Sequence, residues 1–462
     1  MARAASCSAT STTKPGRDRC AGPRLTAPRP ACAPAPPQSA GPARRHRGRS
    51  RRRLIPITAP PRRGAHTRAA TSTAEAAMPA PSRRPCLPSR CRLAVVLALA
   101  AGAAHAESGW KASGDLRMGY VASESRARSG AGSDADSLRA RLRLRLRGEL
   151  GGGWHASGRL AARLDSEQDD TQFWMRRYAP GPSGLEDGQG TIDEAYLEYR
   201  PADARWRLRL GRFQAAWGLD DVMKKSLDQN DSSNFDITWT DGAWLQWRPG
   251  DDWTAHLVLR HNDRRGPTGS LRPPLAFDHG GSRVGVLAVA ESTTAIGPLV
   301  QRVVTLNWLP SALHPYGVAD PRVEDYLAVT TKATAQWPLG AGGTTLRLGG
   351  ELGYAPRTPR REAVGSGAGS AGSLSWQASL NVIDLVPGHD LALVYGRVAD
   401  GWLLSGDFRP NDTLAEVRWV WRASEAWQFD ARLRRREEID LPAGVPHARR
   451  DDDLYVRATW RF

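Results

Sequence analysis

The chain has 462 residues and a formal net charge of +17, but its charge and its cysteines are distributed very unevenly. The first 106 residues hold 20 basic residues and two acidic ones, so the rest carries 45 basic and 46 acidic residues, a net charge of −1. The basic charge therefore does not indicate nucleic-acid binding by the folded part. All five cysteines also precede residue 107, which excludes disulfides and cysteine-based metal sites after it.

Residues 1–77 are rich in Pro, Ala, Ser, Thr and Arg and poor in large apolar residues, which predicts disorder. A nucleic-acid-binding tail is the alternative for this stretch. Residues 78–106 have the pattern of a secretory signal peptide, with arginines first, then an apolar stretch, and Ala104-His105-Ala106 as the cleavage site. We therefore expect translation to start at Met78, which makes 1–77 a mis-assigned leader, and the mature chain to start at Glu107.

The stretch from Ser137 to Arg147 alternates leucine or alanine with arginine. In a strand, successive side chains point to opposite faces, so the apolar residues share one face and the arginines share the other. A helix would scatter both sets around its circumference. This pattern fits a soluble sheet, or an outer-membrane barrel whose apolar face contacts lipid and whose charged face lines a wet lumen.

About sixteen segments with this two-residue period follow one another after residue 107. They are predicted at 108–122, 137–149, 154–166, 191–200, 205–215, 238–248, 252–262, 282–291, 299–309, 324–336, 344–355, 374–385, 390–400, 412–422, 427–438 and 452–462. Short connections with turn residues alternate with long ones, which lie at 123–136, 167–190, 216–237, 263–281, 310–323, 356–373, 401–411 and 439–451. No apolar stretch approaches the ~20 residues of a membrane helix. An even number of strands with alternating short and long connections predicts an all-β, antiparallel outer-membrane barrel over 107–462.

All 17 tryptophans follow residue 107, and many flank the predicted connections. Trp154, Trp206, Trp247, Trp253, Trp337, Trp421 and Trp427 flank short connections, whereas Trp217, Trp239, Trp308 and Trp402 flank long ones. Indole rings favour the level of the lipid headgroups, so we expect an aromatic girdle at each rim. Ordinary core tryptophan is the alternative interpretation.

The last predicted strand alternates apolar and polar residues and ends in phenylalanine, with Trp460 and Phe462 on its apolar face. It resembles the C-terminal strand by which outer-membrane proteins are recognised for barrel assembly. With the signal peptide and the alternation, residues 107–462 resemble a Gram-negative porin. The segment LRLGRFQAAWGLD at 208–220 is similar to the strand-into-loop segment of the phosphate-selective porin O and P type. The resemblance implies an outer-membrane location, contact with the barrel-assembly machinery through Trp460 and Phe462, and a homotrimer as an option.

If the leucines face lipid, arginines at alternate positions of several strands face the lumen. The predicted pore-lining residues are Arg139, Arg141, Arg143, Arg145, Arg147, Arg159, Arg163, Arg205, Arg207, Arg209, Arg432, Arg434 and Arg436. Rows of cations in a pore attract anions. Acids such as Glu194, Glu198, Glu416 and Asp430 can pair with them across strands, so the sequence predicts only a weak preference for anions.

The 22-residue connection 216–237 is the third long loop. Sixteen-stranded porins, which the chain resembles, fold this loop into the barrel as a constriction. Here it offers both signs of charge, namely Asp220, Asp221, Lys224, Lys225, Asp228 and Asp231. Opposite an arginine wall, these residues would create a transverse field at the narrowest point. An external solvated loop is the alternative.

These features predict a porin for passive diffusion of small hydrophilic solutes and ions, surrounded by outer-membrane lipid. A channel selective for an organic anion or a saccharide is the first alternative, and a non-conducting structural or adhesin barrel is the second. Candidate histidines and serines such as His256, His261, His279, Ser232 and Ser233 stand in no catalytic motif, so no enzyme activity is expected. We also expect no cofactor, no metal and no nucleic-acid partner.

Overall fold

The structure is a computed structural model that describes residues 109–166, 172–174, 189–231, 234–235, 237–262, 283–320, 322–340 and 342–462. The predicted leader at 1–77 and signal peptide at 78–106 lie outside these residues. So do most of the predicted loop 167–190 and all of the predicted loop 263–281. Within the described ranges, no helix is long and apolar enough to cross a membrane.

The described part of the chain consists almost entirely of strands. They are β1 (Trp110–Arg126), β2 (Gly132–Gly151), β3 (Trp154–Asp165), β4 (Gln172–Trp174), β5 (Gln189–Tyr199), β6 (Trp206–Phe213), β7 (Thr240–Trp247), β8 (Thr254–Asn262), β9 (Arg283–Ser292), β10 (Leu299–Leu313), β11 (Glu324–Pro338), β12 (Thr345–Tyr354), β13 (Leu374–Val386), β14 (His389–Val398), β15 (Asp412–Arg422), β16 (Trp427–Glu438) and β17 (Arg450–Arg461). A single described turn of helix, α2 (Arg361–Val364), interrupts the connection between β12 and β13.

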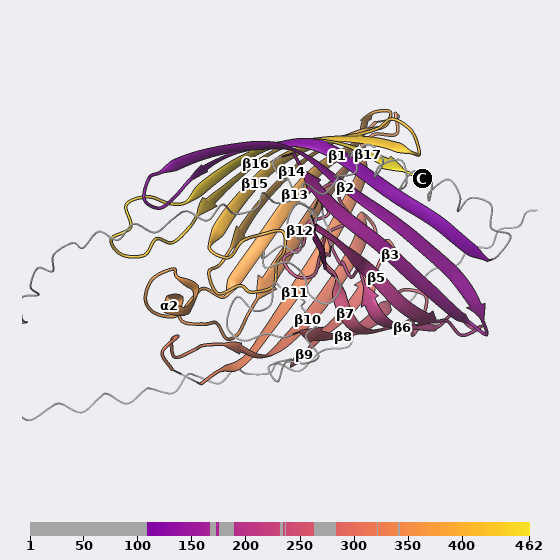
Figure 1. Cartoon of the computed structure of the whole chain (residues 1–462), viewed down its shortest axis with the longest axis horizontal. Helices are drawn as coiled ribbons and strands as arrows, with labels where there is room; N and C mark the ends of the chain where they lie inside the picture. The colour runs from indigo at the N-terminus through magenta and orange to yellow at the C-terminus, as the bar shows by residue number, and fades with distance from the viewer. Residues whose placement is uncertain are drawn as a thin grey trace, which may run out of the picture. The chain divides into compact units, whose positions relative to one another are not determined.

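The strands form one closed sheet. β1 pairs with β2 on one side and with β17 on the other, and every other pair of barrel neighbours is also antiparallel (Figure 1). The three-residue β4 is different because it pairs with β5 in parallel, while β3 and β5 pair directly with each other. The barrel itself therefore has sixteen strands, which confirms the predicted fold class. Closure leaves no sheet edge with unpaired backbone groups, as a bilayer requires.

The alternation predicted for the arginine-rich strand is present in β2. Arg141 and Arg143 are buried, with 0% and 6% of their surface exposed, whereas Leu138 and Leu146 are 65% and 48% exposed. The same contrast recurs around the sheet, where outward leucines, valines and tyrosines alternate with buried polar residues. This arrangement places the polar groups in the lumen and gives the outer wall an apolar surface suited to lipid.

The first connection is shorter than predicted. Residues 123–136 were expected to form a long loop, but β1 continues to Arg126 and β2 begins at Gly132. The turn between them closes with a hydrogen bond from the Ala127 amide to the Ala131 carbonyl oxygen at 2.8 Å. The prediction was wrong because this hairpin is polar on both faces, so its sequence lacks the alternation by which a half-buried strand is recognised.

Among the tryptophans whose side chains the structure describes, a girdle is present at one rim. The seven tryptophans beside the short connections are between 36% and 52% exposed, with Trp206 and Trp427 at the lower end of this range. Beside the long connections, Trp308 is 38% exposed, but Trp217, Trp239 and Trp402 are at most 5% exposed. The girdle expected at the second rim is therefore wrong for these three residues, because the segments that carry them pack against the protein itself.

Candidate pore constriction

The segment between β6 and β7 crosses the lumen. On one side, the Asp220 amide donates to Gln301 Oε1 of β10 at 2.6 Å and the Val222 amide donates to Asn381 Oδ1 of β13 at 3.1 Å. On the other side, Arg117 of β1 donates to the Asn234 carbonyl oxygen at 2.5 Å. Contacts with inward-facing residues of both walls place the segment 216–237 inside the barrel rather than outside it.

This constriction segment, as we call residues 216–237, folds back on itself. The Trp217 amide donates to the Gln229 carbonyl oxygen at 3.1 Å, and Ala216 and Asn230 form an isolated bridge. The tip between these two arms carries Val222 and Met223, and Met223 is buried. A short internal ladder of this kind gives a segment without regular strands a defined shape, because its backbone groups find partners within the segment.

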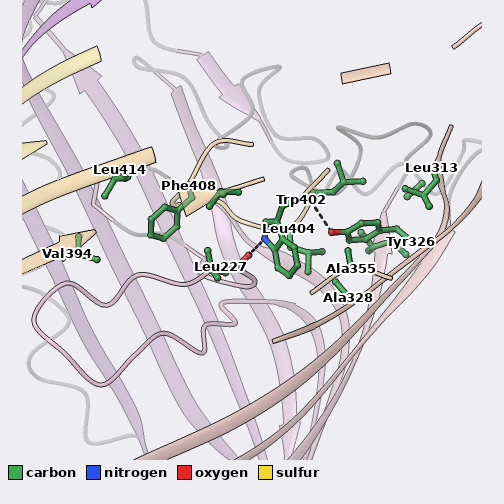
Figure 2. Packing of buried hydrophobic residues seen from close by; sticks show 14 of the residues in the cluster. Leu227, Leu313, Tyr326, Ala328, Ala355, Val394, Trp402, Leu404, Phe408 and Leu414 are labelled. Atoms are coloured by element: carbon green, nitrogen blue, oxygen red, sulfur yellow. Dashed lines mark hydrogen bonds between the residues drawn. The ribbon is translucent and has the colours of Figure 1, made fainter. Parts of the chain in front are cut away.

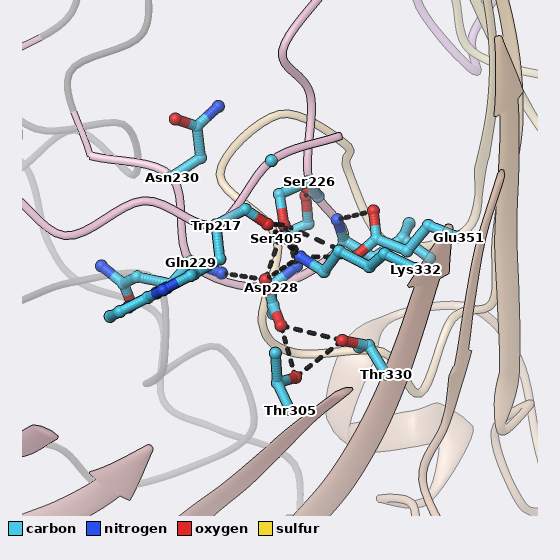
Figure 3. Close-up of polar contacts among 12 residues, drawn as sticks. Trp217, Ser226, Asp228, Gln229, Asn230, Thr305, Thr330, Lys332, Glu351 and Ser405 are labelled. Atoms are coloured by element: carbon cyan, nitrogen blue, oxygen red, sulfur yellow. Dashed lines mark hydrogen bonds and ion pairs between the residues drawn. The ribbon is translucent and has the colours of Figure 1, made fainter. Parts of the chain in front are cut away.

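A buried ion network anchors the constriction segment to the wall (Figure 3). Lys332 Nζ of β11 lies 2.7 Å from Asp228 Oδ1 of the segment and 3.0 Å from Glu351 Oε1 of β12. Asp228 Oδ2 also accepts hydrogen bonds from the hydroxyl groups of Thr305 at 2.6 Å and Thr330 at 2.9 Å. All of these side chains are buried. Charges removed from water this completely persist only when each has a partner, so the network fixes Asp228 in place.

A second segment, predicted from the sequence only as a long connection at 401–411, also packs against the constriction segment. This segment is the connection 399–411, between β14 and β15. Its Trp402 Nε1 donates a hydrogen bond to the Leu227 carbonyl oxygen at 2.7 Å. Ser405 Oγ donates to the Ser226 carbonyl oxygen at 2.7 Å, and Asn230 Nδ2 donates to Asp407 Oδ2 at 2.6 Å. The two segments therefore support each other within the lumen.

An apolar cluster joins the two segments to the wall (Figure 2). It contains Met223 and Leu227 from the constriction segment, Trp402 and Phe408 from 399–411, and inward-facing residues of β10, β11, β14 and β15. Glycines in the wall make room for the rings, since a Cβ at Gly353 or at Gly396 would lie 2.5 Å from the ring of Trp402 or Phe408 respectively. This side of the lumen is consequently filled by protein. The apolar residues 402–404 were a usable signal, because a solvated loop has no reason to carry Trp-Leu-Leu.

The six predicted constriction residues have different surroundings. Asp220 lies 2.9 Å from Arg347 of β12, and Lys225 lies 3.0 Å from Glu416 of β15. Asp221 is buried and accepts the Lys224 amide hydrogen at 2.5 Å, while Asp231 accepts the Ala215 amide hydrogen at 2.9 Å. Together with Asp228 in the ion network, they bring both signs of charge into the lumen.

The predicted pore-lining arginines of β2 and β3 are paired with carboxylates. Arg139 lies 3.0 Å from Asp165, Arg141 lies 2.9 Å from Asp115, Arg143 lies 2.9 Å from Asp193, Arg145 lies 2.7 Å from Glu194, Arg147 lies 3.2 Å from Glu198 and Arg159 lies 2.7 Å from Asp193. Arg163 is buried on β3. The pairing register shifts between Arg159 and Leu160, and this bulge turns both Asp193 and Glu194 inward. Sequence alternation alone assigns only one of two consecutive residues to the lumen, so it missed Asp193.

The arginines near the start of β6 share one carboxylate. Arg209 Nη2 lies 2.6 Å from Glu198 and its guanidinium group stacks on Tyr196, 4.3 Å from the ring centre. Arg207 lies 3.9 Å from Glu198, whereas Arg205 precedes the strand and is exposed.

The arginines of β16 are less fully compensated. Arg434 lies 2.6 Å from Asp453 of β17, but Arg432 comes no closer than 3.8 Å to Glu416. Among the described residues, Arg436 donates to the Asp407 carbonyl oxygen alone, at 3.2 Å. The inward cations of this strand therefore keep more of their field than those of β2 and β3.

Comparison with known proteins gives a family and a fold. The Gram-negative porin family matches residues 93–255, and no curated protein sequence matches the chain. Among solved structures, OprB of Pseudomonas putida is 10% identical with a TM-score of 0.53, covering 77% of this chain and 94% of its own. An anion-selective porin from Comamonas acidovorans is 12% identical with a TM-score of 0.46, covering 76% of this chain and 100% of its own. The channel DcaP of Acinetobacter baumannii is 12% identical with a TM-score of 0.46, covering 76% and 97%.

The sequence match covers the first barrel strands, and OprB shares the fold. The closed sheet, its apolar outer wall and its charged lumen are those of a channel through a bilayer. Together, the family match over residues 93–255 and the sixteen-stranded antiparallel barrel support a channel for passive diffusion in the cell outer membrane, similar to the Gram-negative porins.

Proposed function

We propose that this porin conducts small hydrophilic solutes and ions through the part of the lumen beside the constriction segment, with a weak preference for anions. The supporting observation is a cavity of about 600 Å³ between that segment and the inward-facing side chains of β1 and β12–β17. A cavity of about 10–15 Å³ is enough for a single buried water, so this much larger cavity has room for a hydrated solute.

The preference for anions is supported by the charges around this cavity. Seven cationic side chains line it against four acidic ones: Arg117, Lys224, Arg347, Arg418, Arg422, Arg457 and Arg461 against Asp220, Asp221, Asp231 and Asp390. Three of the four acids lie on the constriction segment, whereas six of the cations lie on the wall. A solute passing between them experiences a transverse field, and the excess of cations raises the local concentration of anions.

Single-channel recording in planar bilayers tests this proposal. We expect stepwise conductance, and a reversal potential in a salt gradient that indicates anion preference. The shift should be larger in dilute salt, because the Debye length is about 30 Å at 0.01 M and about 3 Å at 1 M. A barrel that never conducts would instead support the structural or adhesin alternative, and a reversal potential on the cation side would overturn the anion preference.

Assembly is part of the same proposal. We infer that Trp460 and Phe462 are recognised by the barrel-assembly machinery, and their support is a continuous apolar face at the end of β17. The two rings lie 4.7 Å apart, and Trp460 stacks on Trp427 of β16 at 6.2 Å. A kinship with the phosphate-selective O and P type, carried by residues 208–220, and a homotrimer belong to this proposal as well. Phe462→Ser should lower the amount of barrel recovered from outer membranes, and cross-linking of intact cells reports the number of subunits.

A further inference from the structure

A second, smaller cavity lies between the constriction segment and β15–β17. Its volume is about 70 Å³, which is room for a few waters or for one small oxyanion group. Six cationic side chains line it against two carboxylates: Lys225, Arg418, Arg432, Arg434, Arg436 and Arg457 against Asp407 and Glu416. Met223, Asn234, Arg418 and Arg457 line both this cavity and the larger one, so the two adjoin the same part of the constriction.

The carboxylates near this cavity are already committed to four of the six cations. Arg434 has Asp453 at 2.6 Å, Lys225 has Glu416 at 3.0 Å, and Arg457 has Asp430 at 2.8 Å. Arg418 shares Asp430 with Arg457. Of the other two, Arg432 reaches only Glu416, at 3.8 Å, and Lys225 already holds that carboxylate at 3.0 Å, while Arg436 has no ion pair among the described residues.

These two arginines also have donor groups without an acceptor. The Nε atoms of Arg432 and Arg436 are buried, and in the part of the chain that the structure describes neither has a hydrogen-bond partner. The Arg432 side chain is only 10% exposed, and its guanidinium group stacks on the Tyr455 ring at 4.5 Å. A buried donor that lacks an acceptor is costly to a fold, so such a group in a cavity points to an acceptor supplied from solution.

We propose that this cavity is a binding site for the carboxylate or phosphate group of a permeating solute, held by Arg432 and Arg436. The planar guanidinium fork matches the geometry of two oxygens on one oxyanion, which a spherical chloride ion does not offer. This inference rests on the proposed conduction through the lumen. It adds to that proposal the position of a binding site and the chemical class of the solute group that binds there. Oxyanions bind there briefly while they pass, so they slow the flow of chloride.

Block of the chloride current in planar bilayers tests the site, with inorganic phosphate and acetate as separate probes. For the unmodified protein we expect each probe to reduce the current in a saturable way. The probe that the cavity binds more tightly should halve the chloride current at a lower concentration. The double variant Arg432→Gln, Arg436→Gln should weaken half-block about ten-fold or more, which corresponds to the loss of at least one charge-assisted hydrogen bond. The matched control is Arg145→Gln, because Arg145 is an inward arginine that Glu194 already compensates; its half-block should stay unchanged.

The possible results separate the site from the channel itself. A porin that conducts chloride but shows no saturable block, or equal block in the double variant, overturns the site and leaves passive conduction standing. Equal weakening in Arg145→Gln would reduce the effect to general charge and also overturn it. A chain that never conducts contradicts the proposed function instead. If the glutamine variant does not assemble, Arg432→Lys, Arg436→Lys keeps both charges without the fork, and we expect normal chloride conductance with weakened block.

Discussion

At the residue scale, the inward arginines of this barrel differ in which groups compensate their charge. Arg145 and Arg159 face Glu194 at 2.7 and 2.8 Å, and the bulge in β5 adds Asp193 beside it. Among the three inward arginines of β16, which are Arg432, Arg434 and Arg436, Arg434 has a close carboxylate of its own. The field in the lumen is therefore set by where carboxylates are missing, and not by the number of arginines on a strand.

Lys332 is the residue whose removal should disturb the constriction most. Lys332→Met leaves Asp228 and Glu351 buried without a cation, and losing one partner of a buried pair costs about 3–5 kcal/mol. We expect a lower free energy of unfolding in urea and noisier single-channel currents, because the constriction segment loses its anchor. Arg322→Met is the control: its pair with Asp320 is exposed and worth at most about 1 kcal/mol. Equal losses in both variants would contradict the anchoring role.

The lipid face can be tested on β2. Leu144→Arg places a charge on the outer wall and should lower the free energy of unfolding by roughly 2–4 kcal/mol if the site is near the bilayer midplane. Leu144→Ile keeps the apolar surface and serves as the control. Urea unfolding in lipid vesicles measures both. A tolerated arginine would mean that this face does not contact lipid.

At the scale of elements, the constriction consists of two segments that are far apart in the chain. The segment 216–237 supplies most of the charges, and 399–411 supplies the apolar rings that hold it against the wall. Neither segment is a regular helix or strand, so each depends on the other and on the barrel for its shape. The two cavities beside the constriction segment consequently lie mainly against β15–β17 and β1.

Trp402→Ala should enlarge the pore. It removes a fully buried ring and the hydrogen bond to the Leu227 carbonyl oxygen, a change that costs about 3–5 kcal/mol in a packed core. We expect higher single-channel conductance, since the constriction segment is less firmly held. Trp308→Ala on the exposed rim should leave conductance unchanged. If Trp402→Ala conducts like the unmodified porin, segment 399–411 does not position the constriction.

At the scale of the whole molecule, the sorting of the connections by length defines two rims. The rim with the long connections carries 399–411 and α2, and the other carries the tight turns near Gly152 and Gly388. In outer-membrane barrels the long loops face the outside and the short turns face the periplasm. The orientation of this barrel in the membrane can therefore be tested by labelling.

Single cysteines are informative here because the chain has none after residue 91. Val318→Cys, in the exposed connection between β10 and β11, should react with a membrane-impermeant thiol reagent on intact cells. Asp251→Cys, in the short turn between β7 and β8, should react only after the outer membrane is permeabilised. The reverse pattern would invert the assigned orientation.

The sequence by itself determined the barrel and the bounds of many strands. The stretches predicted at 412–422 and 427–438 coincide with β15 and β16. This was possible because successive residues of a strand point to opposite faces. One face contacts lipid and the other contacts water, so apolar and polar residues alternate within each strand. The sequence also showed that 216–237 carries both signs of charge, since residue identity alone gives the charge of a side chain, whatever it contacts.

The tertiary structure alone decided how the lumen is built. It paired Asp228 with Lys332 and Lys225 with Glu416, residues 104 and more positions apart, and it brought 399–411 inside the barrel. It also left Arg432 and Arg436 less fully compensated than Arg145, which pairs closely with Glu194 on another wall. Alternation says only that a side chain faces inward. Which inward side chains meet depends on the register of all sixteen strands and on the packing of segments without a period of their own, so no local pattern contains it.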